Sequence, residues 1–413
     1  MKKELSPSKF VKYDSLFMIE PELIGYNGHL FNYAKSISDC LIGTSTSFKI
    51  FVSKNCERKI LKEINSSVVF DKLPNESIFN NFIGRFVIAV FQYNFHLYKG
   101  LRNISKKEIL KNKLLFFGTI QHIHLFGLIA WIALSEKNNL PKSIILTLRL
   151  SIYRYDINRW AASYFWYIIA FRLIESIKNK CDIFFITDSN KLQEEFAKIT
   201  KIKIHLLPIP HTINNLEKIS LDSMKGNETT TFTSLGNARK PKGFGILVDA
   251  IIELSDDVNF SKFHFLLQSN FAKNDYYILN KINEIKKRNF KNVELLEKEL
   301  SEKDYYSLMQ KSKVIIIPYD QSVYFANTSG ILTEAISYAK PIIVTEGTWM
   351  SENMPEGVGV TFKDKNSSDL AKKMILIAEK YSDFKSNLIQ KSITWNEYHN
   401  ATNFLKMLFQ ISK

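Results

Sequence analysis

Residues 319–350 read YDQSVYFANTSGILTEAISYAKPIIVTEGTWM, and this stretch predicts a helix between two buried strands. The run before it, residues 314–318, is rich in β-branched residues and ends in proline, which indicates a buried strand. Small polar residues at 327–330 can begin a helix, and Pro341 ends it. The apolar residues 342–344 predict the second strand. The stretch is therefore one βαβ unit of a parallel α/β sheet.

The start of this predicted helix suits a phosphorylated ligand. Thr328, Ser329 and Gly330 place backbone N–H groups at a helix N-terminus that follows a parallel strand, where open α/β sheets bind anions. Glu334, one turn further on, can accept hydrogen bonds from both hydroxyls of a ribose. As a polar residue near a helix start, it is not expected in the core.

This segment resembles the donor-sugar site of retaining GT-B glycosyltransferases of group 1 (family 4-like), which include enzymes of bacterial polysaccharide and glycolipid biosynthesis. That class has a Glu, seven residues, a second Glu followed by Ala, and a closing Gly-x-Pro. Glu334 and Ala335 match the second Glu and the Ala, and residues 339–341 stand for the closing element. Ala326 occupies the place of the first Glu, so the carboxylate that the class places near the transferred sugar is missing. The alternative is an ordinary βαβ crossover with a polar helix start.

A second glycine-rich loop follows the predicted strand 231–235. It carries Gly236, Arg239 and Lys242, and cations in a loop between strand and helix predict a diphosphate site. The resembled class shows Gly-Arg and then Lys-Gly. Lys242 matches the second half, whereas Asn237 replaces the Arg and Arg239 lies two places on. The alternative is a solvated basic turn.

The first half of the chain also alternates strands and helices. Residues 15–19 predict the first strand, which leads through a loop containing Gly28 to a helix that begins near His29. The resemblance implies that this loop contacts donor phosphate or acceptor. His29 could equally be a capping or surface residue.

Two further candidates follow predicted strands of the first half. His122 comes after strand 114–120 and is expected to line the cleft, while its i,i+2 spacing from His124 lacks a third metal ligand. Arg149 follows strand 143–148, where the resembled class often has a His that faces the transferring sugar. An arginine cannot act as a general base, so Arg149 is expected to pair with a phosphate or an acidic sugar.

The fold class predicted is α/β. The resemblance implies a GT-B architecture, with two Rossmann-like domains facing a central cleft and a C-terminal helix crossing back to the first domain. We predict an acceptor-side domain over 1–212 and a polar linker over 213–230. A nucleotide-sugar-binding domain is expected over 231–390, and a terminal helix over 391–413 that packs back toward the first domain.

The charge of the chain and the motifs it lacks limit the classes of partner that we expect. The 413 residues include 56 Lys and Arg against 41 Asp and Glu, a net charge of +15. No nucleic-acid-binding motif accompanies this charge, so nucleic acid is not expected as a partner. No Asp-x-Asp triplet occurs, so neither a metal nor another cofactor is expected. The three cysteines fit a reducing compartment, and the first twenty residues lack the apolar segment of a signal peptide.

Two aromatic segments, 78–98 and 160–171, leave two interpretations open. They can be buried helices, or helices that lie on an anionic membrane surface. The cysteines and the first twenty residues predict a cytoplasmic location. If the aromatic segments lie on a membrane, the protein would attach peripherally to the inner face of the cell membrane.

The resemblance as a whole implies a hexosyltransferase-type enzyme. It would move a sugar with retention from a UDP- or GDP-linked nucleotide sugar to a saccharide or lipid-linked acceptor. An epimerase-like GT-B enzyme and a non-catalytic GT-B binding protein remain as alternatives, and Ala326 is the feature that keeps the latter open.

Overall fold

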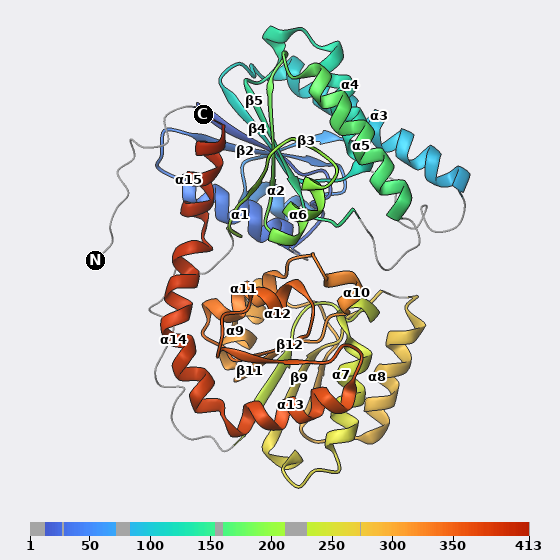
Figure 1. The fold of residues 1–413 in the computed structure, drawn as a ribbon, viewed down its shortest axis with the longest axis vertical. Coiled ribbons are helices and arrows are strands. Elements are labelled where there is room, and N and C mark those ends of the chain that lie inside the picture. The colour runs from blue at the N-terminus through green and yellow to red at the C-terminus, as the bar shows by residue number, and fades with distance from the viewer. Residues whose placement is uncertain are drawn as a thin grey trace. The chain divides into compact units, whose positions relative to one another are not determined.

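Two parallel β-sheets organise the chain, and each belongs to a separate compact unit (Figure 1). The computed structural model describes residues 13–26, 29–71, 83–152, 160–210, 229–272 and 274–412. The first unit spans Met1–Pro210 and takes in Ala401–Lys413, and the second spans His211–Asn400.

The sheet of the first unit has seven parallel strands in the order β3-β2-β1-β4-β5-β6-β7. The strands are β1 (Ser15–Ile19), β2 (Ser47–Ser53), β3 (Ser66–Phe70), β4 (Lys113–Ile120), β5 (Ser143–Leu148), β6 (Asp182–Thr187) and β7 (Ile204–Leu206). The order reverses between β1 and β4, where Ser15 lies opposite both Ser47 and Lys113. Such a reversal is where open α/β sheets leave room for a ligand.

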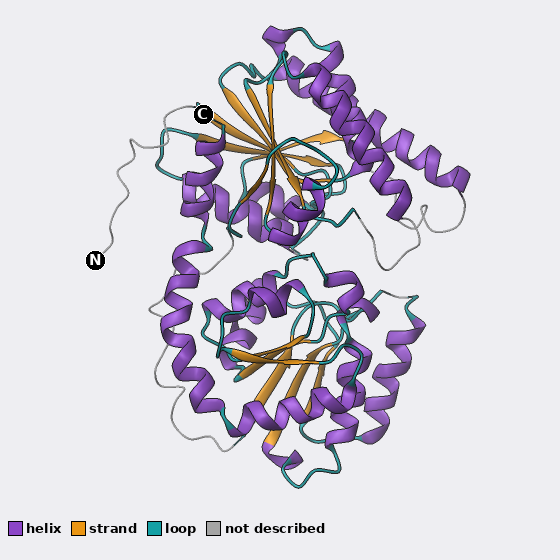
Figure 2. Ribbon diagram, viewed as in Figure 1, coloured by secondary structure: helices purple, strands orange, loops and turns teal. Residues whose placement is uncertain are grey.

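Helices cover both faces of this sheet (Figure 2). They are α1 (His29–Leu41), α2 (Arg58–Glu63), α3 (Ile83–Lys107), α4 (His122–Leu134), α5 (Trp160–Ile177), α6 (Asn190–Ala197) and α15 (Ala401–Ile411). α3, α4 and α5 pack together, and α1 packs against α15. Because side chains alternate along a strand, Leu16 and Met18 point into the core that includes α1 and α15.

The chain turns from the second unit into the first at Asn400. We predicted a terminal helix over 391–413, but residue 391 falls inside α14 (Tyr381–Tyr398), and the unit boundary lies after Asn400. The Asn400 side chain donates to the carbonyls of Asn396 and Glu397, at 2.7 and 2.9 Å. A side chain that occupies these carbonyls competes with helix continuation, which explains the break.

The sheet of the second unit has six parallel strands in the order β10-β9-β8-β11-β12-β13. The strands are β8 (Thr230–Ser234), β9 (Phe263–Gln268), β10 (Val293–Leu296), β11 (Val314–Ile317), β12 (Ile342–Thr345) and β13 (Gly359–Phe362). Its helices are α7 (Phe244–Leu254), α8 (Tyr276–Arg288), α9 (Glu302–Lys311), α10 (Gln321–Tyr324), α11 (Gly330–Ser337), α12 (Trp349–Asn353), α13 (Ser367–Glu379) and α14. The predicted βαβ unit is confirmed as β11, α11 and β12. The predicted linker 213–230 lies outside the described residues except at its end, where β8 begins.

Candidate active site

The glycine-rich loop after β8 is held against the end of β11. Gly243 has φ of 69°, and a Cβ there would meet the carbonyl oxygen of Pro318 at 1.7 Å, so the close approach requires glycine. The backbone N–H of Asp320 donates to the carbonyl of Pro241 at 2.9 Å. The loops that follow β8 and β11 therefore lie side by side.

A chain of amide hydrogen bonds fixes the start of the same loop. The Gly236 N–H donates to Gln268 Oε1 at 2.6 Å, and Gln268 Nε2 donates to Asn270 Oδ1 at 3.0 Å. Asn270 Nδ2 then donates to Asn237 Oδ1 at 3.0 Å. Asn237, which stands where the resembled class has an arginine, is thus held by Asn270, which lies just after β9.

The loop carries cations that have no counter-ion among the described residues. The Lys242 ammonium lies 2.5 Å from where a Cβ of Gly236 would be and 5.6 Å from the centre of the Tyr319 ring. Burial, reinforced by Arg239, lowers the pKa of Lys242 to about 7. Neither Lys242 nor the exposed Arg239 has an ion-pair partner in the part of the chain that the structure describes. A phosphate group would supply the missing negative charge.

The start of α11 adjoins this loop. Ser329 is its N-cap and accepts a hydrogen bond from the Leu332 N–H at 3.4 Å. Ile331 Cδ1 lies 3.3 Å from the Cβ position of Gly236. The structure thus brings the predicted residues Gly236 and Lys242 together with the predicted helix start formed by Thr328, Ser329 and Gly330.

Glu334 lies deeper than the sequence indicated. It is only 4% exposed, so the expectation that it would lie outside the core is wrong. The neighbours that enclose it include Tyr305 and Tyr306 of α9, which lie almost thirty residues earlier in the chain. Burial raises the pKa of Glu334 to about 7, while a hydrogen bond from the Tyr305 hydroxyl lowers it. The position where the resembled class has its first Glu is a buried alanine, Ala326, so it offers no carboxylate.

In the first unit, Arg149 is buried among partners of its own. Its Nε donates to the Gly118 carbonyl at 2.9 Å, and its Nη1 lies 3.2 Å from Asp188 Oδ2. Its guanidinium lies 4.3 Å from the centre of the Tyr33 ring. The structure therefore shows Arg149 paired with a carboxylate of the protein, which leaves its predicted pairing with a phosphate or an acidic sugar a prediction.

The acidic members of this cluster were not predicted from the sequence. Glu20 follows β1 and is fully buried, and burial raises its pKa well above the usual range, with Glu22 adding to the shift and Arg149 opposing it. Asp188 follows β6, and its Oδ1 has no hydrogen-bond partner among the described residues. Glu20, Arg149 and Asp188 follow β1, β5 and β6, so they meet at the carboxyl edge of the sheet, near the reversal of strand order. The sequence signal for each of the two acids is a carboxylate directly after a buried strand, since ligands bind at the carboxyl ends of such strands.

The histidines of the first unit differ in role. His124 is buried, its ring stacks on Tyr93 with centroids 4.2 Å apart, and burial lowers its pKa to about 3, so it is a neutral core residue. His122 is half-buried and borders an apolar groove, with its ring edge-on to Tyr167. Gly28 lies outside the described residues. His29 begins α1, and nothing is described of its side chain.

Comparisons with known proteins agree with this architecture. The family model described as glycosyl transferases, group 1, matches residues 229–380. The second unit contains a glycosyltransferase domain. The prediction of a glycosyltransferase enzyme is thereby confirmed. No curated protein matched the chain.

Solved structures with similar folds cover nearly the whole chain. A glycosyltransferase from Rickettsia africae is 13% identical with a TM-score of 0.65, covering 98% of each chain. Anabaena HepE, solved with UDP and glucose, is 13% identical with a TM-score of 0.63, covering 97% of this chain and 99% of its own. The trehalose-phosphate synthase of Burkholderia xenovorans is 8% identical with a TM-score of 0.71, covering 97% of this chain and 100% of its own. At these identities the likeness shows the fold, and the predicted GT-B fold is confirmed.

Proposed function

We propose that this glycosyltransferase moves a hexose from a UDP- or GDP-linked nucleotide sugar to a saccharide or lipid-linked acceptor, with retention of configuration. The observation that carries the proposal is the pair of uncompensated cations, Lys242 and Arg239, beside the start of α11. This arrangement suits a diphosphate, and Glu334 of the same helix is proposed to bind the ribose. The UDP-glucose bound to Anabaena HepE supports a uridine donor.

The same groups would act on the leaving group. As the glycosidic bond breaks, negative charge grows on the diphosphate, and preoriented cations and backbone N–H groups stabilise that charge. With Ala326 in place of a carboxylate, this position offers no protein nucleophile, which supports same-face attack assisted by the leaving phosphate. Arg149 and His122 are proposed to act on the sugar or acceptor side.

The donor site is proposed to work without a metal or another cofactor. In the described residues no group of three or more His, Cys, Asp or Glu is arranged to hold a metal ion. The proposal rests on the cations, which supply the charge that a bridging metal would otherwise provide.

A non-catalytic nucleotide-sugar-binding protein is the second candidate, because Ala326 removes a carboxylate usual in the resembled class. Turnover separates the two. The protein would be incubated with UDP- and GDP-hexoses, with and without saccharide and lipid-linked acceptors and with a chelator present. Release of nucleoside diphosphate that requires an acceptor, with the product anomer read by NMR, supports transfer. Donor binding without acceptor-dependent release supports the binding protein.

The proposed location is the cytoplasm, with peripheral attachment to the inner face of the cell membrane. Among the helices that the structure describes, none has the length and apolar character to cross a bilayer. The net charge of +15 and the aromatic helices α3 and α5 support attachment to an anionic surface.

A further inference from the structure

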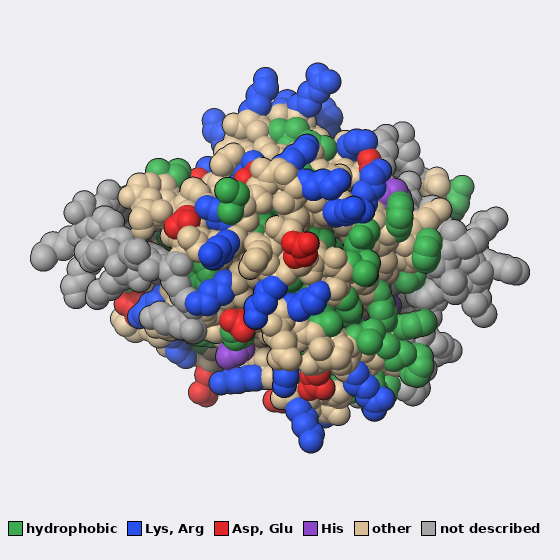
Figure 3. Space-filling model, turned by 90° about the horizontal axis from the view of Figure 1, so that it is seen from above, with side chains coloured by type: hydrophobic (Ala, Val, Ile, Leu, Met, Phe, Trp, Pro, Cys, Tyr) green, Lys and Arg blue, Asp and Glu red, His purple; other side chains and the backbone are tan. Residues whose placement is uncertain are grey.

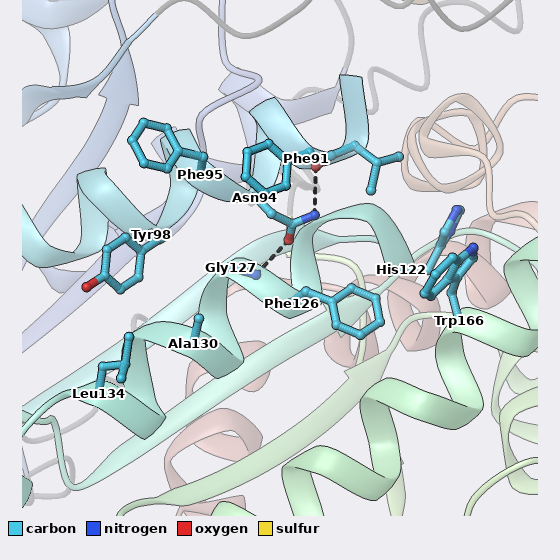
Figure 4. A pocket seen from close by; sticks show the side chains of 11 residues that line it. Phe91, Asn94, Phe95, Tyr98, His122, Phe126, Gly127, Ala130, Leu134 and Trp166 are labelled. Atoms are coloured by element: carbon cyan, nitrogen blue, oxygen red, sulfur yellow. Dashed lines mark hydrogen bonds between the residues drawn. The ribbon is translucent and has the colours of Figure 1, made fainter. Parts of the chain in front are cut away.

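An apolar groove runs along the first unit between α3 and α4, with α5 at one end (Figure 4). Its volume is about 550 Å³, which lies in the range of small-ligand sites. Phe91 and Phe95 of α3, Phe126 of α4 and Trp166 of α5 line it. Its ends carry the polar groups, with His122 near Trp166 and Tyr98 near Leu134 (Figure 4).

The floor of the groove offers a ligand no free amide. A Cβ on Gly127 would meet the backbone oxygen of Asn94 at 2.3 Å, so the missing side chain lets α3 and α4 approach closely. Asn94 Oδ1 accepts a hydrogen bond from the Gly127 N–H at 2.6 Å, and Asn94 Nδ2 donates to the Val90 carbonyl at 2.9 Å. Both polar atoms of the one amide side chain in the groove are thus used within the protein, and the middle of the groove presents hydrocarbon surface.

The groove opens onto an exposed apolar patch. Large apolar side chains of α3, α4 and α5 are exposed, and Phe91 is exposed by 72%. The exposed side chains are Phe91, Phe95, Leu134, Phe165, Trp166 and Leu173. Figure 3 shows hydrophobic side chains gathered on one flank of the molecule, with Lys and Arg side chains beside them. A patch of this kind indicates an interaction site.

The charge beside the patch has one sign on α3. That helix contains five Lys and Arg residues and no Asp or Glu, although Lys99 pairs with Asp71 at 3.2 Å, and α4 contains no residue of either charge. A two-fold contact with a second copy would bring these cations against their own counterparts, which is unfavourable. An anionic lipid suits this surface, since it combines an apolar chain with a negative headgroup.

We propose that the groove binds one hydrocarbon chain of an anionic membrane lipid, with its headgroup near the cations of α3. This site deepens the proposed function, because a bound lipid chain favours a lipid-linked acceptor over a free saccharide. That conclusion about the acceptor rests on the proposed function. Chain binding itself does not depend on catalysis and is measured separately.

The probe is lysophosphatidylglycerol with chains of 8 to 14 carbons, kept below the concentration at which micelles form. We expect affinity to rise by up to about fourfold per methylene and then to level off when the chain fills the groove. Lysophosphatidylcholine of equal length is expected to bind at least fivefold more weakly. Calorimetry measures both series on the full chain.

Two substitutions decide between the groove and simple adsorption. Ala130→Phe fills the floor of the groove while adding apolar surface, and it is expected to weaken chain binding at least tenfold. Phe91→Ser is expected to weaken it as well, whereas Ile42→Ser, at a residue 76% exposed on another part of the same unit, serves as the matched control and leaves it unchanged. Melting temperatures verify that each variant is folded.

Three results would overturn the proposal. Unchanged binding in Ala130→Phe would show surface adsorption, and an affinity that never levels off with chain length would exclude a finite groove. Self-association of the protein that Phe91→Ser abolishes would show that a second copy covers the patch. Nucleotide-sugar binding, followed in the same variants, tells a failure of the proposed function apart from a failure of this site.

Discussion

Lys242 carries a charge that the free protein disfavours and that a bound diphosphate would favour. Lys242→Ala is expected to weaken nucleoside-diphosphate binding by about 1.5–3 kcal/mol, because one charge-assisted contact is lost. Lys240→Ala is the matched control, since Lys240 is exposed in the same loop and lies over the Tyr277 ring instead. Calorimetry measures both. Equal losses in the two variants would mean that the loop contributes only general positive charge.

The pKa of Lys242 also predicts a pH dependence. In the free protein this pKa is about 7, and a bound diphosphate raises it by favouring the ammonium form. Affinity is therefore expected to fall as the pH rises above about 7, and binding at pH 8 should take up protons. Titrations in buffers of different ionisation enthalpy measure this uptake. Lys242→Ala should abolish the excess proton uptake; if it persists, another group titrates.

Glu334 is expected to show opposite effects on stability and on binding. Its pKa of about 7 in the folded protein exceeds the ordinary 4.5, so stability contributed by its protonated form is full below pH 4.5 and is lost as the pH rises through 7. Glu334→Gln removes this loss and should stabilise the free protein at pH 8 by on the order of 3 kcal/mol, with little effect at pH 4.5. It should also weaken nucleotide binding, because an amide accepts ribose hydrogen bonds less well.

Melting curves at the two pH values and calorimetry with nucleotide test this pair of effects. A variant that melts lower at both pH values would show that the carboxylate is needed for the fold itself. Unchanged nucleotide affinity would remove Glu334 from the donor site.

Among the elements, the loop after β8 depends on its close contact with β11. Gly243→Ala is expected to destabilise the second unit by about 2 kcal/mol or more, from the left-handed backbone and the clash with Pro318 together. Gly357→Ala is the control, because its φ of 75° is similar but its Cβ would meet only the end of the Asn387 side chain at 3.0 Å. It should cost about 1 kcal/mol. Chemical denaturation measures both, and equal losses would exclude the contact as the cause.

Elements set by local pattern could be predicted from the sequence. The strands Ser15–Ile19 and Ser143–Leu148 were predicted to the residue, because each is an apolar run bounded by polar residues. The proximity of Gly236 and Lys242 also follows from a short loop. The cluster of Glu20, Arg149 and Asp188 could not be predicted, because it depends on strand order across 168 residues of sequence. The burial of Glu334 was also missed, because it depends on packing beside Tyr305 and Tyr306 of α9, which lie in another element.

At the scale of the whole molecule, the two units differ in continuity. The apolar core of the second unit is built from residues between Phe232 and Phe384. The core of the first unit includes Phe404, Leu405, Leu408 and Phe409 of α15. A fragment of residues 211–400 is therefore expected to fold alone and bind nucleoside diphosphate. A fragment of residues 1–210 should not unfold cooperatively until a peptide of residues 401–413 is added.

Circular dichroism melts of each fragment and of the mixture measure this difference. A cooperative transition in 1–210 alone would show that α15 is dispensable for that core. The contact of Phe404 with Tyr33, at 5.4 Å between ring centroids, makes Phe404→Ala in the peptide the natural control for specific docking.

Because α15 completes the first unit, the order of synthesis on the ribosome differs from the order in which the cores can close. Residues 1–210 emerge first, but their core lacks its last helix until roughly 190 further residues have been translated, which takes roughly 10 to 40 seconds at usual elongation rates. Phe404 and Leu408 pack in one core with apolar side chains of β1, β4 and α1. Those side chains stay uncovered throughout that interval. We therefore expect apolar surface of the first unit to stay exposed until α15 is made, and the second unit can finish folding before the first.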